Sequence, residues 1–240
     1  MLEEFTKYVS NYDLNDSKIR LKYNHCIRVM NLSHKYATIL GFSKTDIELA
    51  TLIGLLHDIG RFEQIKQYDS YDDLKTIDHA DYSVEQLFKH NLIEKFWKNE
   101  DDYDLIKFAI QNHNKLTIAK TDNERLLEHA KLIRDADKLD IFYLAGVLNE
   151  TKQSASNDKI NDNIIRSIFN HRLGSRKDAN NINDEIAIGY SFVFDINYDA
   201  CLKELKDNFK AYYETVGKQE IFQSIIDEIN KYIDERMIKC

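Results

Sequence analysis

The apolar residues of this chain recur at steps of three and four, and this spacing restricts its fold more than any other feature. The segment from Ser17 to Leu40 is the clearest case. With 3.6 residues per turn, one stripe of a helix over this segment carries Leu21, His25, Val29, Leu32, Tyr36 and Ile39. Such a stripe packs against a core, so His25 is expected to face inward. His34, nine residues further on, belongs to another face.

Further segments with helical spacing follow along the chain. They cover residues 46–58, 77–90, 104–113, 123–148, 163–173, 198–215 and 219–239. The chain has no proline and only seven glycines in 240 residues, which favours helices because sheets and long loops usually need more turn residues. The sequence therefore predicts an all-α fold.

Four stretches are expected outside these helices. Residues 61–64 are interpreted as a connecting segment, and the polar residues 67–75 and 150–162 as loops. Residues 190–196, YSFVFDI, show enough alternation to predict a short strand. Because no partner strand is predicted, an extended or a helical piece is the alternative.

One domain over residues 1–240 is the simplest organisation, because the chain contains no internal repeat, low-complexity segment or evident linker. A chain of this length can bury a sizeable core. The core of the helical bundle is expected at about residues 17–148, and a helical C-terminal extension at about residues 160–240.

Charge and cysteine usage exclude several classes of function. The net charge of -8 argues against a nucleic-acid polymer as the partner, since such partners usually require a basic balance. The three cysteines, Cys26, Cys201 and Cys240, are far apart and form neither a disulfide framework nor a zinc-finger pattern. No run approaches the roughly 18 apolar residues of a membrane span, and the N-terminus lacks a long apolar core. We expect a cytoplasmic protein without a membrane partner.

A polar pair ends the most apolar stretch of the chain. The run from Leu52 to Gly60, LIGLLHDIG, closes with His57 and Asp58 followed by Ile59 and Gly60. On its own the pair has two structural explanations, a core histidine or an aspartate that caps a helix end. Polar residues at other core-facing positions make a functional role for the pair the better explanation.

Three more helices place a polar residue inward. His79 stands in the first turn of its helix, His113 shares a stripe with Ile106 and Ile110, and Asp137 shares one with Ile133. A buried aspartate is costly unless it is paired or bound to a metal. With His25, His57 and Asp58, these residues make four histidines and two aspartates, a set that packing does not explain. Divalent cations bind imidazole and carboxylate together, so the set predicts a metal centre. The absence of cysteine from the set argues against a structural zinc site.

The order His25, His57-Asp58 and Asp137 resembles the H…HD…D pattern of the HD-domain metal-dependent phosphohydrolase superfamily. The surrounding stretches are similar to a bacterial group within it: HCIRV, LLHDIGRFEQ, IDHADYS, QNHNK and RDADKLD. These five stretches occur in the same order, and the resemblance is expected to cover most of the chain. The fold that the resemblance implies is a single HD-type helical bundle.

The resemblance also implies a ligand set. His25, His57, Asp58 and Asp137 would hold one divalent ion, and His79 and His113 match the extra histidines of the binuclear subset, in which the aspartate of the pair bridges two ions. One departure is Asn114, which stands where some binuclear relatives have a second histidine. A mononuclear and a binuclear site therefore both remain compatible with the sequence.

The activity implied is hydrolysis of a phosphate ester or anhydride, with a nucleotide or related small phosphate as substrate and a metal-activated water as nucleophile. Asp58 would act in catalysis through the ions. Arg61 and Lys138 are the best-placed cations for the developing negative charge. The alternative for both is a surface charge or a salt bridge to Glu63 or Asp135.

Two other classes of function use the same features. Some HD-fold relatives are di-iron oxygenases, and a regulatory module could bind metal or nucleotide without turnover. The nitrogen and oxygen ligands accept Mn, Fe, Co, Ni, Zn or Mg, in one or two positions. Iron content, an oxygen requirement and the presence of turnover distinguish these classes from a phosphohydrolase.

Overall fold

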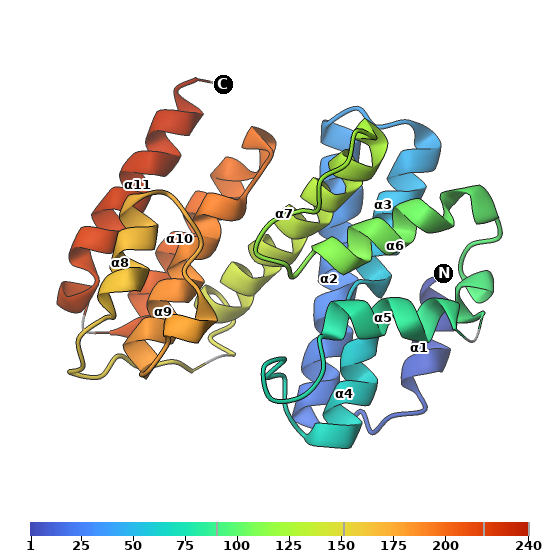
Figure 1. The fold of residues 1–240 in the computed structure, drawn as a ribbon, viewed down its shortest axis with the longest axis horizontal. Coiled ribbons are helices and arrows are strands. Elements are labelled where there is room, and N and C mark those ends of the chain that lie inside the picture. Colours follow the sequence, from blue (N-terminus) through green and yellow to red (C-terminus); the bar gives the residue numbers. More distant parts are fainter. Residues whose placement is uncertain (90, 151, 218, 240) are drawn as a thin grey trace. The chain divides into compact units, whose positions relative to one another are not determined.

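The computed structural model describes residues 1–89, 91–150, 152–217 and 219–239. Within these residues it contains helices and no strand, so the predicted all-α fold is confirmed (Figure 1). The α-helices are α1 (Leu2–Val9), α2 (Ser17–Ile39), α3 (Lys44–Leu56), α4 (Gly60–Tyr68), α5 (His79–Phe88), α6 (Tyr103–Asn112), α7 (Glu124–Gly146), α8 (Asp162–Phe169), α9 (Ile182–Ser191), α10 (Leu202–Val216) and α11 (Gln223–Met237). The short 3-10 helices are η1 (Leu92–Lys95), η2 (Glu100–Asp102), η3 (Arg176–Asp178), η4 (Phe192–Asp195), η5 (Asp199–Cys201) and η6 (Gln219–Ile221).

The chain divides into two compact units, Met1–Asp137 and Lys138–Cys240, and the boundary between them falls inside α7. In the first unit α2 and α3 pack side by side (Figure 1). A Cβ atom on Gly54 would lie 2.8 Å from the carbonyl oxygen of Val29, so only glycine permits this close approach. The approach brings His25, in α2, next to His57 at the end of α3.

The turn between α3 and α4 is shorter than the sequence suggests. Only His57, Asp58 and Ile59 separate the end of α3 at Leu56 from the start of α4 at Gly60. Residues 61–64, predicted to be a connecting segment, therefore form the first turns of a helix, and that prediction is wrong. The helix α1 at the N-terminus was also not predicted from the sequence.

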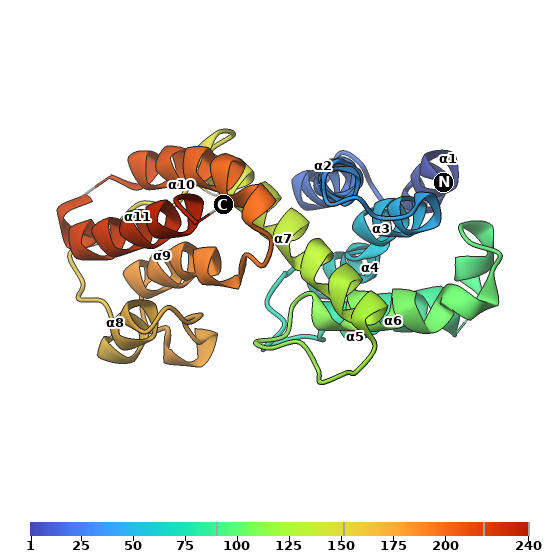
Figure 2. The same cartoon turned by 90° about the horizontal axis from the view of Figure 1, so that it is seen from above.

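The second unit contains α8 to α11, which Figure 2 shows from above. The strand predicted for residues 190–196 is not formed. Tyr190 belongs to the last turn of α9, and Phe192–Asp195 is the 3-10 helix η4. A strand needs a partner for its backbone hydrogen bonds, and among the described residues there is none. The helical alternative is the correct one, and it buries Tyr190 against Phe209 and Phe222.

Candidate metal centre

The structure brings the six predicted ligands together in the first unit, and most of them lie at helix ends. They are His25 in α2, His57 and Asp58 directly after α3, His79 at the start of α5, His113 directly after α6, and Asp137 in α7. Asp78 fixes the start of α5, because its Oδ1 accepts hydrogen bonds from the backbone N–H groups of Ala80 and Asp81 at 3.0 and 3.1 Å. All the ligands except Asp137 are buried, and the Asp137 side chain is 13% exposed.

A first group of donor atoms consists of two imidazole nitrogens and two carboxylate oxygens. His25 Nε2 lies 3.2 Å from His57 Nε2, 3.5 Å from Asp58 Oδ2 and 3.2 Å from Asp137 Oδ1. His57 Nε2 lies 3.7 Å from Asp58 Oδ2 and 3.6 Å from Asp137 Oδ1. Ligand atoms bound to one ion at about 2.0–2.2 Å are separated by about 3.0–3.6 Å, so this group has the spacing of a coordination shell.

A second group uses the other oxygen of the same aspartate. His79 Nε2 lies 2.9 Å from His113 Nε2, and these nitrogens lie 3.3 and 3.6 Å from Asp58 Oδ1. Asp58 thus turns Oδ2 toward the first group and Oδ1 toward the second. Both groups have the spacing and composition of a metal site. The two groups share Asp58, which could contribute one oxygen to each.

Hydrogen bonds at the outer ring nitrogens leave the second group with a donor set that suits a cation. His113 Nδ1 donates to the carbonyl oxygen of Ile110 at 2.7 Å, and His79 Nδ1 donates to Asp73 Oδ2 at 2.5 Å. Both Nε2 atoms therefore carry lone pairs and face each other, and Asp58 Oδ1 is buried without a hydrogen-bond partner. Among the described residues no hydrogen-bond donor lies between the three acceptor atoms, so they repel one another, whereas one bound cation would satisfy all three. The residues fit a divalent ion.

The protonation states also suit metal binding. Burial lowers the pKa of His57, and burial together with the charge of Arg61 lowers the pKa of His79 to about 3. Burial alone would raise the pKa of Asp58, but Lys22 and His57 hold it well below its usual value. His57 and His79 are therefore neutral imidazoles and Asp58 is an ionised carboxylate near neutral pH, which are the forms that metals bind.

Arg61, predicted to be a catalytic cation, lies beside the second group. Its Nη1 donates to Asp73 Oδ1 at 2.7 Å and to the carbonyl oxygen of Tyr71 at 2.8 Å. Its Nε lies 3.7 Å from Asp58 Oδ1 and is buried without a hydrogen-bond partner. Arg61 is therefore held rigidly with one donor unused at the centre.

Two charged residues of the centre were not predicted from the sequence. Lys22 Nζ lies 2.6 Å from Asp58 Oδ2, and Asp73 contacts both His79 and Arg61. Lys22 precedes His25 by three residues, so it lies one helical turn away on the same face of α2, and helical spacing alone could have identified it. Asp73 lies in the loop between α4 and α5, where no helical period applies.

Lys138, the other predicted catalytic cation, belongs to the second unit. Its Nζ lies 2.7 Å from Asp195 Oδ2, and its side chain is 7% exposed. The acidic partner seen here is thus neither Glu63 nor Asp135, the two alternatives considered from the sequence.

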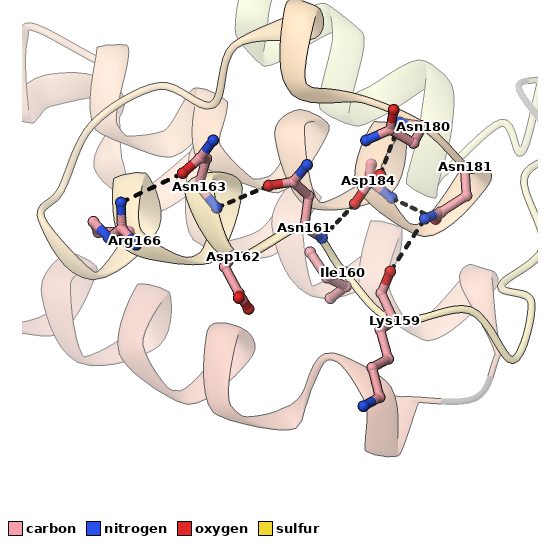
Figure 3. Close-up of a pocket in the computed structure, with 9 residues that line it drawn as sticks. All are labelled: Lys159, Ile160, Asn161, Asp162, Asn163, Arg166, Asn180, Asn181 and Asp184. Atoms are coloured by element: carbon pink, nitrogen blue, oxygen red, sulfur yellow. Dashed lines mark hydrogen bonds between the residues drawn. The ribbon is translucent and has the colours of Figure 1, made fainter.

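The second unit contains a cavity of about 540 Å³ with a polar lining (Figure 3). Asp184 is one of the lining residues and accepts hydrogen bonds from the backbone N–H groups of Asn161 and Asn180 at 2.7 and 2.8 Å. The Asn181 side chain donates to the carbonyl oxygen of Lys159 at 3.1 Å. These groups connect the loops that precede α8 and α9, so they stabilise the unit itself.

The fold and the centre define an all-α protein with a candidate histidine and aspartate metal site. The family model described as "HD domain" matches residues 23–141, a range that includes every predicted ligand. The chain belongs to the HD-domain superfamily, which comprises metal-dependent hydrolases, and the predicted resemblance is confirmed. Comparisons with curated proteins and with solved structures gave no significant match. No helix in the described part of the chain is long and apolar enough to cross a membrane.

The close approach of α4 and α5 gives a first prediction about the second group. A Cβ atom at Gly60 would lie 2.7 Å from the backbone nitrogen of Ser83 and 2.9 Å from the carbonyl oxygen of His79. Gly60→Ala should therefore push α5 away, lower the free energy of unfolding by about 1–3 kcal/mol and weaken metal binding at the second group. Urea unfolding and metal titration measure the two effects.

Gly41→Ala is the control for this substitution, because Gly41 has a φ of 74° and no neighbouring atom within 4 Å of a Cβ. It should cost about 1 kcal/mol through backbone strain alone and leave metal binding unchanged. Equal metal affinities in the two variants would contradict the role assigned to Gly60.

The histidine pKa values predict how stability depends on pH in a chelating buffer. An unfolded histidine has a pKa of about 6.5, and the folded pKa of His79 is about 3, so the unfolded chain binds more protons between these values. The free energy of unfolding should therefore fall as the pH is lowered through this window, by about 1.4 kcal/mol per pH unit for each such histidine. Urea unfolding between pH 7.5 and 5 measures the slope.

His79→Asn should reduce this slope. A slope that is the same in the parent and in the variant would show that the His79 ring does not contribute to it.

Proposed function

We propose that this protein is a metal-dependent phosphohydrolase that cleaves a phosphate ester or anhydride, with a nucleotide or a related small phosphate as substrate. The observation that carries the proposal is the position of Asp58, whose two oxygens face two separate groups of histidines. Membership of a hydrolase superfamily supports it. Bound divalent ions would supply an activated water and neutralise the charge of the phosphoryl group.

The protein's own residues would have distinct tasks. His25, His57 and Asp137 would hold the first ion, and His79 and His113 the second, with Asp58 shared. Arg61 would donate its unused Nε–H to an oxygen of the phosphoryl group, because a buried donor without an acceptor is costly and is satisfied when an anion arrives. Tyr71 supports this geometry, since its ring lies 5.8 Å from the Arg61 guanidinium carbon.

Metal content and hydrolysis test the proposal together. Protein purified without chelator should contain close to two ions per chain, and His79→Ala and His113→Ala should each contain close to one. Hydrolysis of a panel of nucleotides and phosphoesters should be strongly reduced in both variants. His34→Ala provides the control, because His34 is exposed and its Nδ1 contacts Thr51 in another part of the unit.

Two results would contradict the proposal. A parent protein that binds no metal even after supplementation would exclude the metal centre. A parent that binds iron and consumes oxygen, without releasing phosphate from any compound of the panel, would indicate the oxygenase class instead.

A further inference from the structure

A loop aspartate connects the second group of ligands to the neighbouring arginine. We infer that Asp73 is a positioning residue that determines whether the second metal position is filled, and that it does so by holding His79 and Arg61 in one geometry. This inference rests on the metal centre of the proposed function. Asp73 is not a metal ligand itself, but it would decide whether the site is mononuclear or binuclear.

The first step concerns the orientation of His79. Its Nδ1 donates to Asp73 Oδ2 at 2.5 Å, which leaves the lone pair of Nε2 directed at Asp58 Oδ1 and His113. A carboxylate behind a ligand histidine fixes the ring and makes it a stronger donor to a metal. The corresponding nitrogens of His57 and His113 donate to backbone carbonyl oxygens, those of Gly54 and Ile110. Of these three rings, His79 is the one whose outer partner is a side chain.

The second step concerns Arg61. Asp73 Oδ1 accepts from Arg61 Nη1 at 2.7 Å and from Gln64 Nε2 at 3.0 Å. Arg61 Nε in turn lies 3.7 Å from Asp58 Oδ1. The contacts form a closed circuit from Asp58 through His79, Asp73 and Arg61 back to Asp58. One carboxylate therefore sets both the ligand and the cation of the second position.

The third step concerns the loop that carries Asp73. The Tyr71 hydroxyl donates to the carbonyl oxygen of Lys18 at 2.8 Å, and Lys18 also pairs with Asp69. Gln64 Nε2 donates to the Thr76 hydroxyl at 2.8 Å. These bonds hold both ends of the loop against α2 and α4, so Asp73 is fixed before any ligand binds.

Asn114 occupies the same surroundings. Its Nδ2 lies 3.5 Å from Asp73 Oδ2, 3.4 Å from His79 Nδ1 and 3.0 Å from Asp78 Oδ1. The residue that stands in place of a second histidine thus contacts the outer side of His79 and is not part of the second group. The departure from the double-histidine pattern leaves that group intact, and the Asn114 amide donates to Asp73 and Asp78, not to the protonated Nδ1 of His79.

Asp73→Asn tests the inference, because asparagine keeps the size of the side chain and removes its charge. Titration with Mn²⁺, followed by calorimetry and by elemental analysis, should show that the second ion binds about 10- to 100-fold more weakly while the first keeps the parent affinity. Asp72→Asn is the matched control: Asp72 precedes Asp73 in the same loop, its Oδ1 accepts from Leu74 N, and its Oδ2 pairs with exposed Lys75. It should bind both ions as the parent does.

A spectroscopic measurement separates positioning from general structural support. Nitrogen-15 spectra of the metal-free protein report which ring nitrogen of each histidine carries the proton. In the parent, His79 should carry it on Nδ1, and in Asp73→Asn the fraction with the proton on Nε2 should rise. The rings of His57 and His113 should keep their parent spectra, since their outer partners are backbone carbonyl oxygens.

The outcomes distinguish this inference from the proposed function. A parent protein that does not bind two ions contradicts the binuclear centre itself, whatever the variant does. A parent that binds two ions, together with an Asp73→Asn variant that binds both with parent affinities, overturns only the role of Asp73. Loss of both ions in the variant would also overturn it, because Asp73 would then support the whole centre and not the second position.

Discussion

Asp58→Ala should remove both metal positions at once and reduce hydrolytic turnover by at least about 1000-fold. The physical reason is that Oδ2 faces His25 and His57 while Oδ1 faces His79 and His113, so a single side chain contributes to both groups. A factor of 1000 corresponds to about 4 kcal/mol of transition-state stabilisation, which is within what bound ions supply. Elemental analysis and turnover with the best substrate of the panel measure the two losses.

Removal of Asp58 also leaves Lys22 without its carboxylate partner at 2.6 Å. An unpaired charge in a side chain that is only 15% exposed is destabilising, so the variant could lose metal merely because it unfolds. The double variant Asp58→Ala, Lys22→Met separates the two causes, since it removes the charge with the carboxylate. It should regain stability and still bind no metal.

Asp137→Ala is the matched comparison, because Asp137 contacts only the first group. It should lose the first ion and keep some affinity for the second. If Asp58→Ala retained one full ion per chain, the carboxylate would not be shared between two positions.

The positions that the sequence predicted correctly are those fixed by helical periodicity. His25 shares a stripe with Val29 and Tyr36, and all three are buried, whereas Ile39 at the end of the same predicted stripe is 57% exposed. Helical periodicity did not predict that His79 and His113 lie next to each other. That prediction depended on the resemblance to HD domains. Helical spacing shows that a residue faces inward, but not which residue of another helix it meets.

The errors arose where contacts distant in sequence decide the structure. The strand predicted at residues 190–196 relied on alternation over a short stretch. In the structure Tyr190 is buried against Phe209 and Tyr212 of α10 and against Phe222, and this burial favours the helix. Asp73 was missed for a related reason. Its role depends on hydrogen bonds to α4 and α5 that a loop sequence does not reveal.

Arg61→Lys is expected to lower kcat by about 100- to 1000-fold while both ions remain bound. An ammonium group can keep the charge beside Asp73, but it cannot contact Asp73 and at the same time present a second fixed donor at the position of Nε. Loss of one preorganised donor to a developing negative charge usually costs a factor of this size. Turnover at saturating substrate and metal content by elemental analysis measure the two quantities.

Two further variants, Arg61→Gln and Lys138→Met, serve as comparisons for the loss of kcat in Arg61→Lys. Glutamine has no charge to hold Asp73, so Arg61→Gln should weaken binding of the second ion as well as lower kcat. The difference in metal affinity between the two Arg61 variants therefore measures how far Arg61 acts through Asp73.

Lys138 is the other cation predicted from the sequence, and its Nζ pairs with Asp195 at 2.7 Å. We expect Lys138→Met to reduce stability more than kcat, because a cation already paired within the second unit has less capacity to bind a phosphoryl oxygen. A larger loss of kcat in Lys138→Met than in Arg61→Lys would transfer the catalytic role from Arg61 to Lys138.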